Sequence, residues 1–172
     1  MDNLKQLKKE EIISLVKEGK VTVPDIIDSG ICPTCLDRQN NHVVYGDNSD
    51  KIIYEDEALE CFLVGNPRIE GHVAISTKKH FKDMMDIDDE TCNKVFVFAK
   101  KMMNILKEVY MAESIYLCTM CDGPMNHFHV QLIPRYSFEE RGSKNFVKPR
   151  KEYVEDKEKL MQLRNKVLEL QK

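Results

Sequence analysis

The chain has 172 residues, of which 32% are charged and 42% apolar, and its formal net charge is -3. A chain of this length can bury about 70% of its unfolded surface. The weak negative charge argues against general binding to nucleic acids or acidic membranes. No window holds the ~20 consecutive apolar residues that span a bilayer. Residues 1–20 are charged throughout and lack an apolar signal core, so we expect a cytoplasmic protein with reduced thiols.

Helical and β-type patterns alternate along the chain in a simple order. Apolar residues recur at helical spacing over residues 4–18 and 90–110, and again in the tail at 151–172. Short β-type runs occupy residues 43–45, 51–56, 59–64, 71–77, 115–121 and 127–133. Strands joined by short turns pair antiparallel. We therefore predict an α+β domain, with an antiparallel sheet of about five strands packed on the long helix and extra helices at both ends.

The segment NHFHVQLIPRY, residues 126–136, places polar groups at alternate positions of a predicted strand. Side chains of a strand alternate between its two faces, so His127, His129 and Gln131 share one face, at intervals of about 6–7 Å. A chain with five histidines uses two of them here. Clustered histidines of this kind mark catalytic or metal sites more often than a solvated strand face.

Two Cys-x-x-Cys pairs, CPTC at 32–35 and CTMC at 118–121, suggest metal or redox chemistry. CPTC sets two thiolates on one tight turn, as in zinc sites. A four-cysteine site that joins the two pairs is disfavoured, because residues three apart on a strand face opposite ways. A redox dithiol is a weaker alternative, since no thioredoxin-like pattern surrounds either pair.

The segment HFHVQLI resembles the His-φ-His-φ-His-φ-φ signature of the histidine triad (HIT) superfamily, in which φ is apolar, with Gln in the third place. EGHVAISTKKHFKDMMDI is similar to a further segment of the family, and the motifs together cover about residues 32–136. The resemblance implies a HIT-like catalytic domain over 32–136. It leaves an N-terminal helical extension, 1–31, and a basic loop with the C-terminal helix, 137–172. Members with Gln resemble the branch of galactose-1-phosphate uridylyltransferase and the diadenosine tetraphosphate phosphorylases.

The resemblance also implies the roles of single residues. His129 would attack the α-phosphorus of a nucleotide and carry the nucleotidyl group, with Gln131 as its catalytic neighbour. His72 and, as a substitute for a missing carboxylate, Asn66 are the candidate substrate-binding residues. Zinc-bearing members imply a structural zinc, and its implied ligands are Cys32, Cys35, His80 and His127. A homodimer is expected, because the family commonly dimerises.

Gln131 bears on the reaction, because an amide donates hydrogen bonds but holds no titratable proton. We therefore favour nucleotidyl transfer from a nucleoside polyphosphate or nucleotide sugar. One alternative is a hydrolase acting on dinucleoside polyphosphates or nucleoside phosphoramidates, and another is a weakly catalytic nucleotide- or partner-binding zinc module.

The sequence departs from the family pattern at a few positions. Val64 replaces the Asp that many members use for the ribose hydroxyls, and Pro124 and Met125 replace a Ser or Gly near the phosphate. Basic residues also gather between Arg135 and Lys151, where they could receive an anionic group or simply remain solvated.

Overall fold

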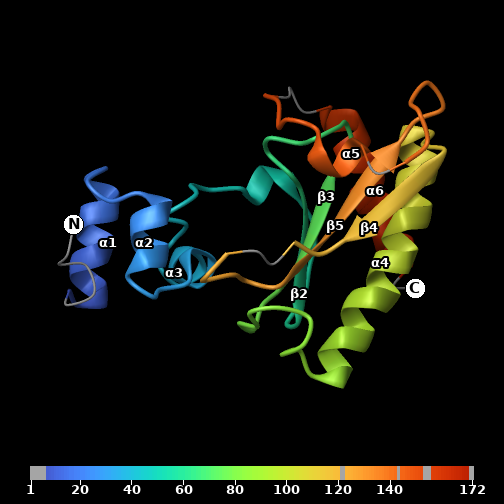
Figure 1. Cartoon of the computed structure of the whole chain (residues 1–172). Helices are drawn as coiled ribbons and strands as arrows, with labels where there is room; N and C mark the ends of the chain where they lie inside the picture. Colours follow the sequence, from blue (N-terminus) through green and yellow to red (C-terminus); the bar gives the residue numbers. More distant parts are fainter. Residues whose placement is uncertain (1–6, 121–122, 143, 153–155, 171–172) are drawn as a thin grey trace.

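The computed structural model describes residues 7–120, 123–142, 144–152 and 156–170. It contains a five-stranded sheet in the order β1-β2-β3-β5-β4, with every neighbouring pair antiparallel (Figure 1). The strands are β1 (Ile52–Glu55), β2 (Leu59–Leu63), β3 (Val73–Thr77), β4 (Ser114–Cys118) and β5 (His129–Arg135). This sheet, with its covering helices, confirms the predicted α+β class.

Two helices cover one face of the sheet, α4 (Asp89–Tyr110) and α6 (Lys157–Glu169) (Figure 1). The side chain of Asp88 accepts a hydrogen bond from the Thr91 N–H at 2.8 Å and so caps the N-terminus of α4. The apolar stripe of α4 packs on β-strand side chains such as Ile75 and Val130, both of which are fully buried. Leu163 of α6 joins the same core. These helices cover one face of the sheet, so a ligand can approach only the other face.

The N-terminal helices form a smaller unit at the side of the sheet away from α4 (Figure 1). They are α1 (Lys9–Lys17), α2 (Val23–Asp28) and α3 (Pro33–Gln39). Ile12, Ile26 and Leu36, one from each helix, make a separate apolar cluster. This cluster fixes α3, whose first turn carries the CPTC motif. Leu4, where the predicted first helix began, lies outside the described residues.

One predicted strand is wrong. Residues 43–45 form part of a turn, which follows left-handed backbone at Asn41 (φ 54°) and His42 (φ 57°). The side chain of buried Asp37 accepts hydrogen bonds from the N–H groups of Val44 and Tyr45, at 2.8 and 2.9 Å. These N–H groups are therefore unavailable to a sheet partner.

Strand β5 begins at His129, two residues later than the predicted run. The C-terminal chain passes through the short helix α5 (Lys144–Val147) before α6. Among the described residues, no helix combines the length and apolarity that a bilayer span needs.

Candidate active site and metal centre

The open face of the sheet borders a cavity of about 660 Å³. His127, His129 and Gln131 all line it; strand alternation places His129 and Gln131 on one face, while His127 lies just before β5 begins. Asn66 also lines it and lies on the loop after β2. Phe62 contributes an apolar wall. The cavity therefore has the size and mixed lining of a small-molecule site.

His129 is oriented through both of its ring nitrogens. Its Nδ1 lies 2.9 Å from the backbone oxygen of His127, which can only accept, so Nδ1 carries the proton. Its Nε2 therefore bears the lone pair and lies 3.3 Å from Nε2 of Gln131, within the cavity. A neutral imidazole with its lone pair turned toward a substrate cavity is an available nucleophile.

The hydrogen bonds continue behind Gln131 to His72. The backbone N–H of Arg68 donates to His72 Nδ1 at 3.2 Å, which leaves the proton of a neutral His72 on Nε2. That Nε2–H donates to Oε1 of Gln131 at 3.0 Å, and the Gln131 amide then turns its N–H group to His129. In this series of hydrogen bonds, each group donates to the next one, from Arg68 through His72 and Gln131 to His129. The orientation of the amide follows from these partners.

His72 lies behind Gln131. It is 1% exposed and lines a small adjoining cavity of about 20 Å³ rather than the large one. Burial, with a smaller contribution from the positive charge of Arg150, lowers the pKa of His72 to about 4. His72 is therefore neutral near pH 7 and acts on Gln131 through a hydrogen bond.

The four predicted ligand residues come together. The candidate donor atoms of Cys32, Cys35, His80 and His127 lie within 4.8 Å of one another. Cys35 Sγ is 3.4 Å from Nδ1 of both histidines, the two Nδ1 atoms are 3.4 Å apart, and Cys32 Sγ is 3.5 Å from His127 Nδ1. The ligand atoms of a tetrahedral zinc are separated by about 3.3–3.8 Å. These residues could therefore hold a metal ion of that geometry.

Two features of the cluster suit a cation. The Nε2 of His127 lies 2.8 Å from the Thr77 carbonyl oxygen, so its proton is on Nε2 and the Nδ1 lone pair faces the cysteines. Burial lowers the pKa of His127 to about 4, which keeps the ring unprotonated. Burial and the neighbouring Cys32 raise the pKa of Cys35 to about 11. A divalent cation would offset that cost of forming a thiolate.

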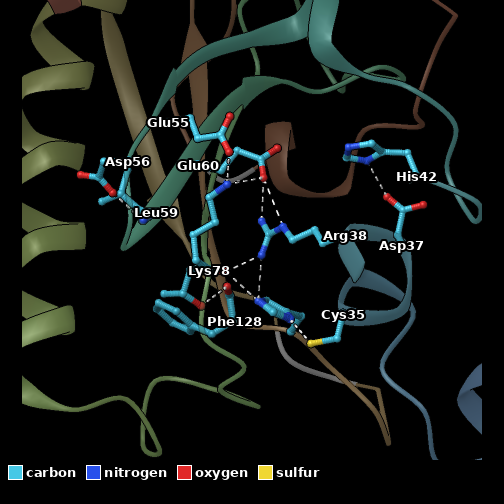
Figure 2. Close-up of polar contacts among 12 residues, drawn as sticks. Cys35, Asp37, Arg38, His42, Glu55, Asp56, Leu59, Glu60, Lys78 and Phe128 are labelled. Carbon is cyan, nitrogen blue, oxygen red and sulfur yellow. Dashed lines mark hydrogen bonds and ion pairs between the residues drawn. The ribbon is translucent and has the colours of Figure 1, made fainter. Parts of the chain in front are cut away.

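Arg38 is a supporting residue that the sequence did not reveal. It lies between Glu60 and Cys35 (Figure 2). Its guanidinium donates to Glu60 at 2.9 Å and to the Thr77 carbonyl oxygen at 2.6 Å, the same oxygen that accepts from His127. Arg38 thereby ties α3 to β2 and β3 next to the cluster of Cys32, Cys35, His80 and His127. An isolated Arg in a polar run carries no motif that could have identified it.

The second Cys-x-x-Cys pair stays apart from this cluster as far as it is described. Cys118 is paired with Gln131 across β4 and β5 and is not among the clustered residues. Cys121 lies outside the described residues. Val64 lines the cavity where the resemblance implied a carboxylate, so an apolar side chain borders that part of the site.

Comparison with known proteins supplies an independent assignment. The family model described as "HIT domain" matches residues 45–138, more than half of the chain. An uncharacterized HIT-like protein of Methanocaldococcus jannaschii is 34% identical over 100 residues, which are 55% of this chain and 75% of the relative. Cys32 and Cys35 precede the matched range, whereas the two histidines of the cluster lie inside it.

Solved structures share the fold at lower identity. A hypothetical histidine triad nucleotide-binding protein from Sulfolobus tokodaii has a TM-score of 0.63 at 23% identity, covering 81% of this chain and 94% of its own. A zinc-bound histidine triad family protein from Mycobacterium smegmatis has a TM-score of 0.57 at 21% identity, covering 70% and 85%. Plasmodium falciparum diadenosine triphosphate hydrolase has a TM-score of 0.56 at 16% identity, covering 73% and 82%. The matched domain and the sheet topology agree, and the chain belongs to the HIT family.

Proposed function

We propose that this protein is a nucleotidyltransferase in which His129 attacks the α-phosphate of a nucleoside polyphosphate or nucleotide sugar. The observation that carries the proposal is the orientation of the His129 ring. Nδ1–H is held by the His127 carbonyl at 2.9 Å, and Nε2 is turned to a cavity of about 660 Å³. An imidazole fixed in this tautomer can attack once the Gln131 N–H passes from its Nε2 to a phosphoryl oxygen of the substrate.

The reaction divides into two displacements. In the first, the Nε2 lone pair forms an N–P bond and the P–O bond to the leaving group breaks, with its electron pair departing on oxygen. Nδ1–H stays hydrogen-bonded to the His127 carbonyl, which stabilises the positive charge that develops on the ring. In the second, an acceptor oxygen attacks phosphorus and the N–P bond breaks, which returns the lone pair to His129.

Gln131 favours transfer over hydrolysis. Its amide nitrogen lies 3.3 Å from His129 Nε2. The amide N–H can donate a hydrogen bond to a phosphoryl oxygen in the adduct, but the amide cannot transfer a proton to the leaving group. His72 behind it is neutral at pH 7, because burial lowers its pKa to about 4. Leaving groups that are stable as anions, such as phosphates, therefore suit this site, as does an acceptor that is already anionic, such as phosphate or a sugar phosphate.

We also propose that the Cys32–Cys35–His80–His127 cluster holds a structural zinc ion. Two thiolates and two imidazoles complete a tetrahedral site and leave no open position for substrate. The proposal is supported by the donor spacing of 3.4–3.5 Å and by the Nε2 bond of His127. Zinc bound there would supply rigidity, since the backbone oxygen of His127 orients the nucleophile.

Two expectations about the surroundings remain proposals. Strand β4 lies at an edge of the sheet and pairs on one side, which supports a homodimer that sedimentation analysis would test. The free thiols of the described cysteines fit the cytoplasmic location predicted from the sequence.

The test is a labelling experiment. The protein is incubated with nucleoside triphosphates of the four bases and with nucleotide sugars, and the intact mass is measured under neutral conditions. We expect one nucleotidyl group per chain, mapped to His129 and absent from His129→Asn. Discharge of the adduct is then compared in buffer with and without orthophosphate. Faster discharge by orthophosphate supports transfer.

Hydrolysis is the second candidate, supported by the shared fold with the diadenosine triphosphate hydrolase of Plasmodium falciparum. It predicts the same adduct, with discharge by water at a rate that orthophosphate does not change. A weakly catalytic binding module predicts nucleotide binding without an adduct. The one experiment thus separates the three functions.

A further inference from the structure

Two cationic side chains, Lys51 and Arg150, line the cavity next to the loop that follows β2. Lys51 and Arg150 both line the cavity together with Gly65 and Asn66. A Cβ atom placed on Gly65 would lie 3.2 Å from Lys51 Nζ, so the ammonium rests against the backbone of this loop. The Arg150 guanidinium donates to the Asn66 backbone oxygen at 3.2 Å. Adjacent loop residues thus bring the two charges to one place.

Neither cation forms an ion pair with the residues that the structure describes. The carboxylate of Asp156 shares a small cavity with Lys51, but it caps α6, and its ion-pair partner is Lys159, at 4.0 Å. Burial and the nearby charge of Arg68 lower the pKa of Arg150. Both observations indicate positive charge without a matching carboxylate.

Three other basic residues of the same sequence run form ion pairs. Lys144 pairs with Glu140, Lys148 with Glu139, and Arg135 with Glu113. Arg150 is the member of the run that turns to the cavity. Half of the run is thus paired; Arg141 and Lys151 form no ion pair with the described residues and do not line the cavity, so Arg150 is the cation of the run that is available to a ligand there.

Arg150 is held in place by neighbouring backbone. Arg68 Nη1 donates to the Lys148 oxygen at 2.5 Å, and the Lys151 N–H donates to the Pro67 oxygen at 3.1 Å, so the chain around Arg150 is fastened to the loop. The Nε atom of Arg68 is buried and has no hydrogen-bond partner within the described residues. Arg68 thus adds a second, incompletely satisfied guanidinium beside Arg150.

The carboxylates of the cavity are occupied elsewhere. Glu60 pairs with Arg38, and Asp37 accepts hydrogen bonds from the N–H groups of Val44 and Tyr45. No described carboxylate therefore neutralises the Lys51–Arg150 pair from the cavity side. Guanidinium and ammonium groups placed so match the oxygens of a phosphate group.

Building on the proposed function, we infer that Lys51 and Arg150 form a second phosphate subsite, distinct from the position of the phosphoryl group that His129 attacks. The phosphate group reaches this subsite in one of two forms. It is carried on the sugar of the same nucleotide, or it is a separate acceptor phosphate. Either form fits a part of the cavity that is lined by Val64 and two cations. An acidic side chain there would repel an anion.

The test is equilibrium binding to the full chain by titration calorimetry. Nucleoside 5′-monophosphates of the four bases are compared with the corresponding 2′,5′- and 3′,5′-bisphosphates. Orthophosphate is titrated separately into the monophosphate complex. The variants are Lys51→Gln/Arg150→Gln and a charge-matched control, Lys94→Gln/Arg141→Gln, whose residues do not line the cavity. Arg150→Lys shows whether charge alone suffices.

A phosphate on the sugar predicts that a bisphosphate binds about tenfold or more tightly than its monophosphate. A separate phosphate predicts saturable orthophosphate binding to the monophosphate complex. In either case the gain in binding from the added phosphate falls below about threefold in the Lys51→Gln/Arg150→Gln variant. The control variant retains that gain. Absence of both effects, or their survival in the cavity variant, overturns the subsite. If monophosphates bind and His129 is labelled, that failure leaves the proposed function intact; if no nucleotide binds and no adduct forms, both are overturned.

Discussion

His127 and His129 are joined by a hydrogen bond that connects the Cys/His cluster to the proposed nucleophile. The Nδ1–H of His129 donates to the backbone oxygen of His127 at 2.9 Å, while the ring of His127 turns its Nδ1 to Cys35 at 3.4 Å. One residue thereby faces the cluster with its side chain and orients its neighbour with its backbone. If the cluster holds the proposed zinc, loss of that ion should disturb both the stability of the protein and the position of His129.

Replacement of a cysteine ligand tests this connection. In small zinc-dependent peptides the metal contributes roughly 10 kcal/mol or more. This chain has a separate apolar core, so we expect Cys35→Ser to lower the free energy of unfolding by about 3 kcal/mol and Tm by about 6–12 °C. Bound zinc, measured by elemental analysis, should fall from one per chain to well below it. Cys118→Ser, outside the cluster, should retain both.

Restoring a histidine at position 131 should change the acceptor. Gln131→His places a titratable group about where the amide now lies, 3.3 Å from His129 Nε2. General acid–base assistance contributes about 10²–10⁴-fold to a proton transfer. We expect the ratio of hydrolysis to phosphate-dependent transfer to rise by at least about tenfold, measured by product analysis at fixed orthophosphate. An unchanged ratio would mean that residue 131 does not govern the choice of acceptor.

Buried His72 should make the protein sensitive to mild acid. Its pKa is about 4 in the folded chain, against an ordinary value of about 6.5 in the unfolded chain. As the pH falls from 6.5 toward 4, the unfolded state takes up a proton that the folded state refuses, so stability is lost in that window. At pH 5 the loss from this one group is about 2 kcal/mol relative to pH 7.5.

Urea unfolding at pH 7.5 and pH 5 measures this effect. The variant His72→Gln has no titratable group at the position, so its stability should fall by about 2 kcal/mol less than that of the wild type over this pH change. Subtraction removes the contribution of His127, which is present in both proteins. Equal losses in the two proteins would show that His72 does not resist protonation.

His72→Gln also tests the positioning of Gln131. The amide of the glutamine introduced at position 72 can preserve one of the two hydrogen bonds of His72. His72→Leu leaves both the Arg68 N–H and Gln131 Oε1 without their partners. Each unsatisfied buried group costs about 1–3 kcal/mol. We expect kcat to fall more in His72→Leu than in His72→Gln, with a smaller change in KM. A mainly raised KM in both variants would indicate direct substrate contact instead.

Local patterns predicted the parts of the site that depend on one strand or one turn. Strand alternation brought His129 and Gln131 to the same cavity, and the CPTC spacing, together with the family resemblance, identified four residues that do converge. The supporting role of Arg38 depends on contacts with Glu60 and Thr77, which are 22 and 39 residues away in the chain, and no local motif records such contacts.

One wrong prediction and one open alternative have similar causes. The run at residues 43–45 has β-type composition, but the side chain of Asp37 binds its backbone N–H groups and holds it in a turn. Composition left open whether the basic residues after Arg135 receive an anion or stay solvated; ion pairs hold Lys144 and Lys148, whereas Arg150 lines the cavity. In both cases distant or mid-range partners, invisible to composition, decide the outcome.

The most direct test of the proposed mechanism is the site of covalent labelling. After incubation with a nucleotide substrate, the wild-type chain should gain the mass of one nucleotidyl group, and peptide mapping should place it on His129. The His129→Asn variant should bind the nucleotide and remain unlabelled. An adduct on another residue, or turnover by His129→Asn at the wild-type rate, would contradict the account.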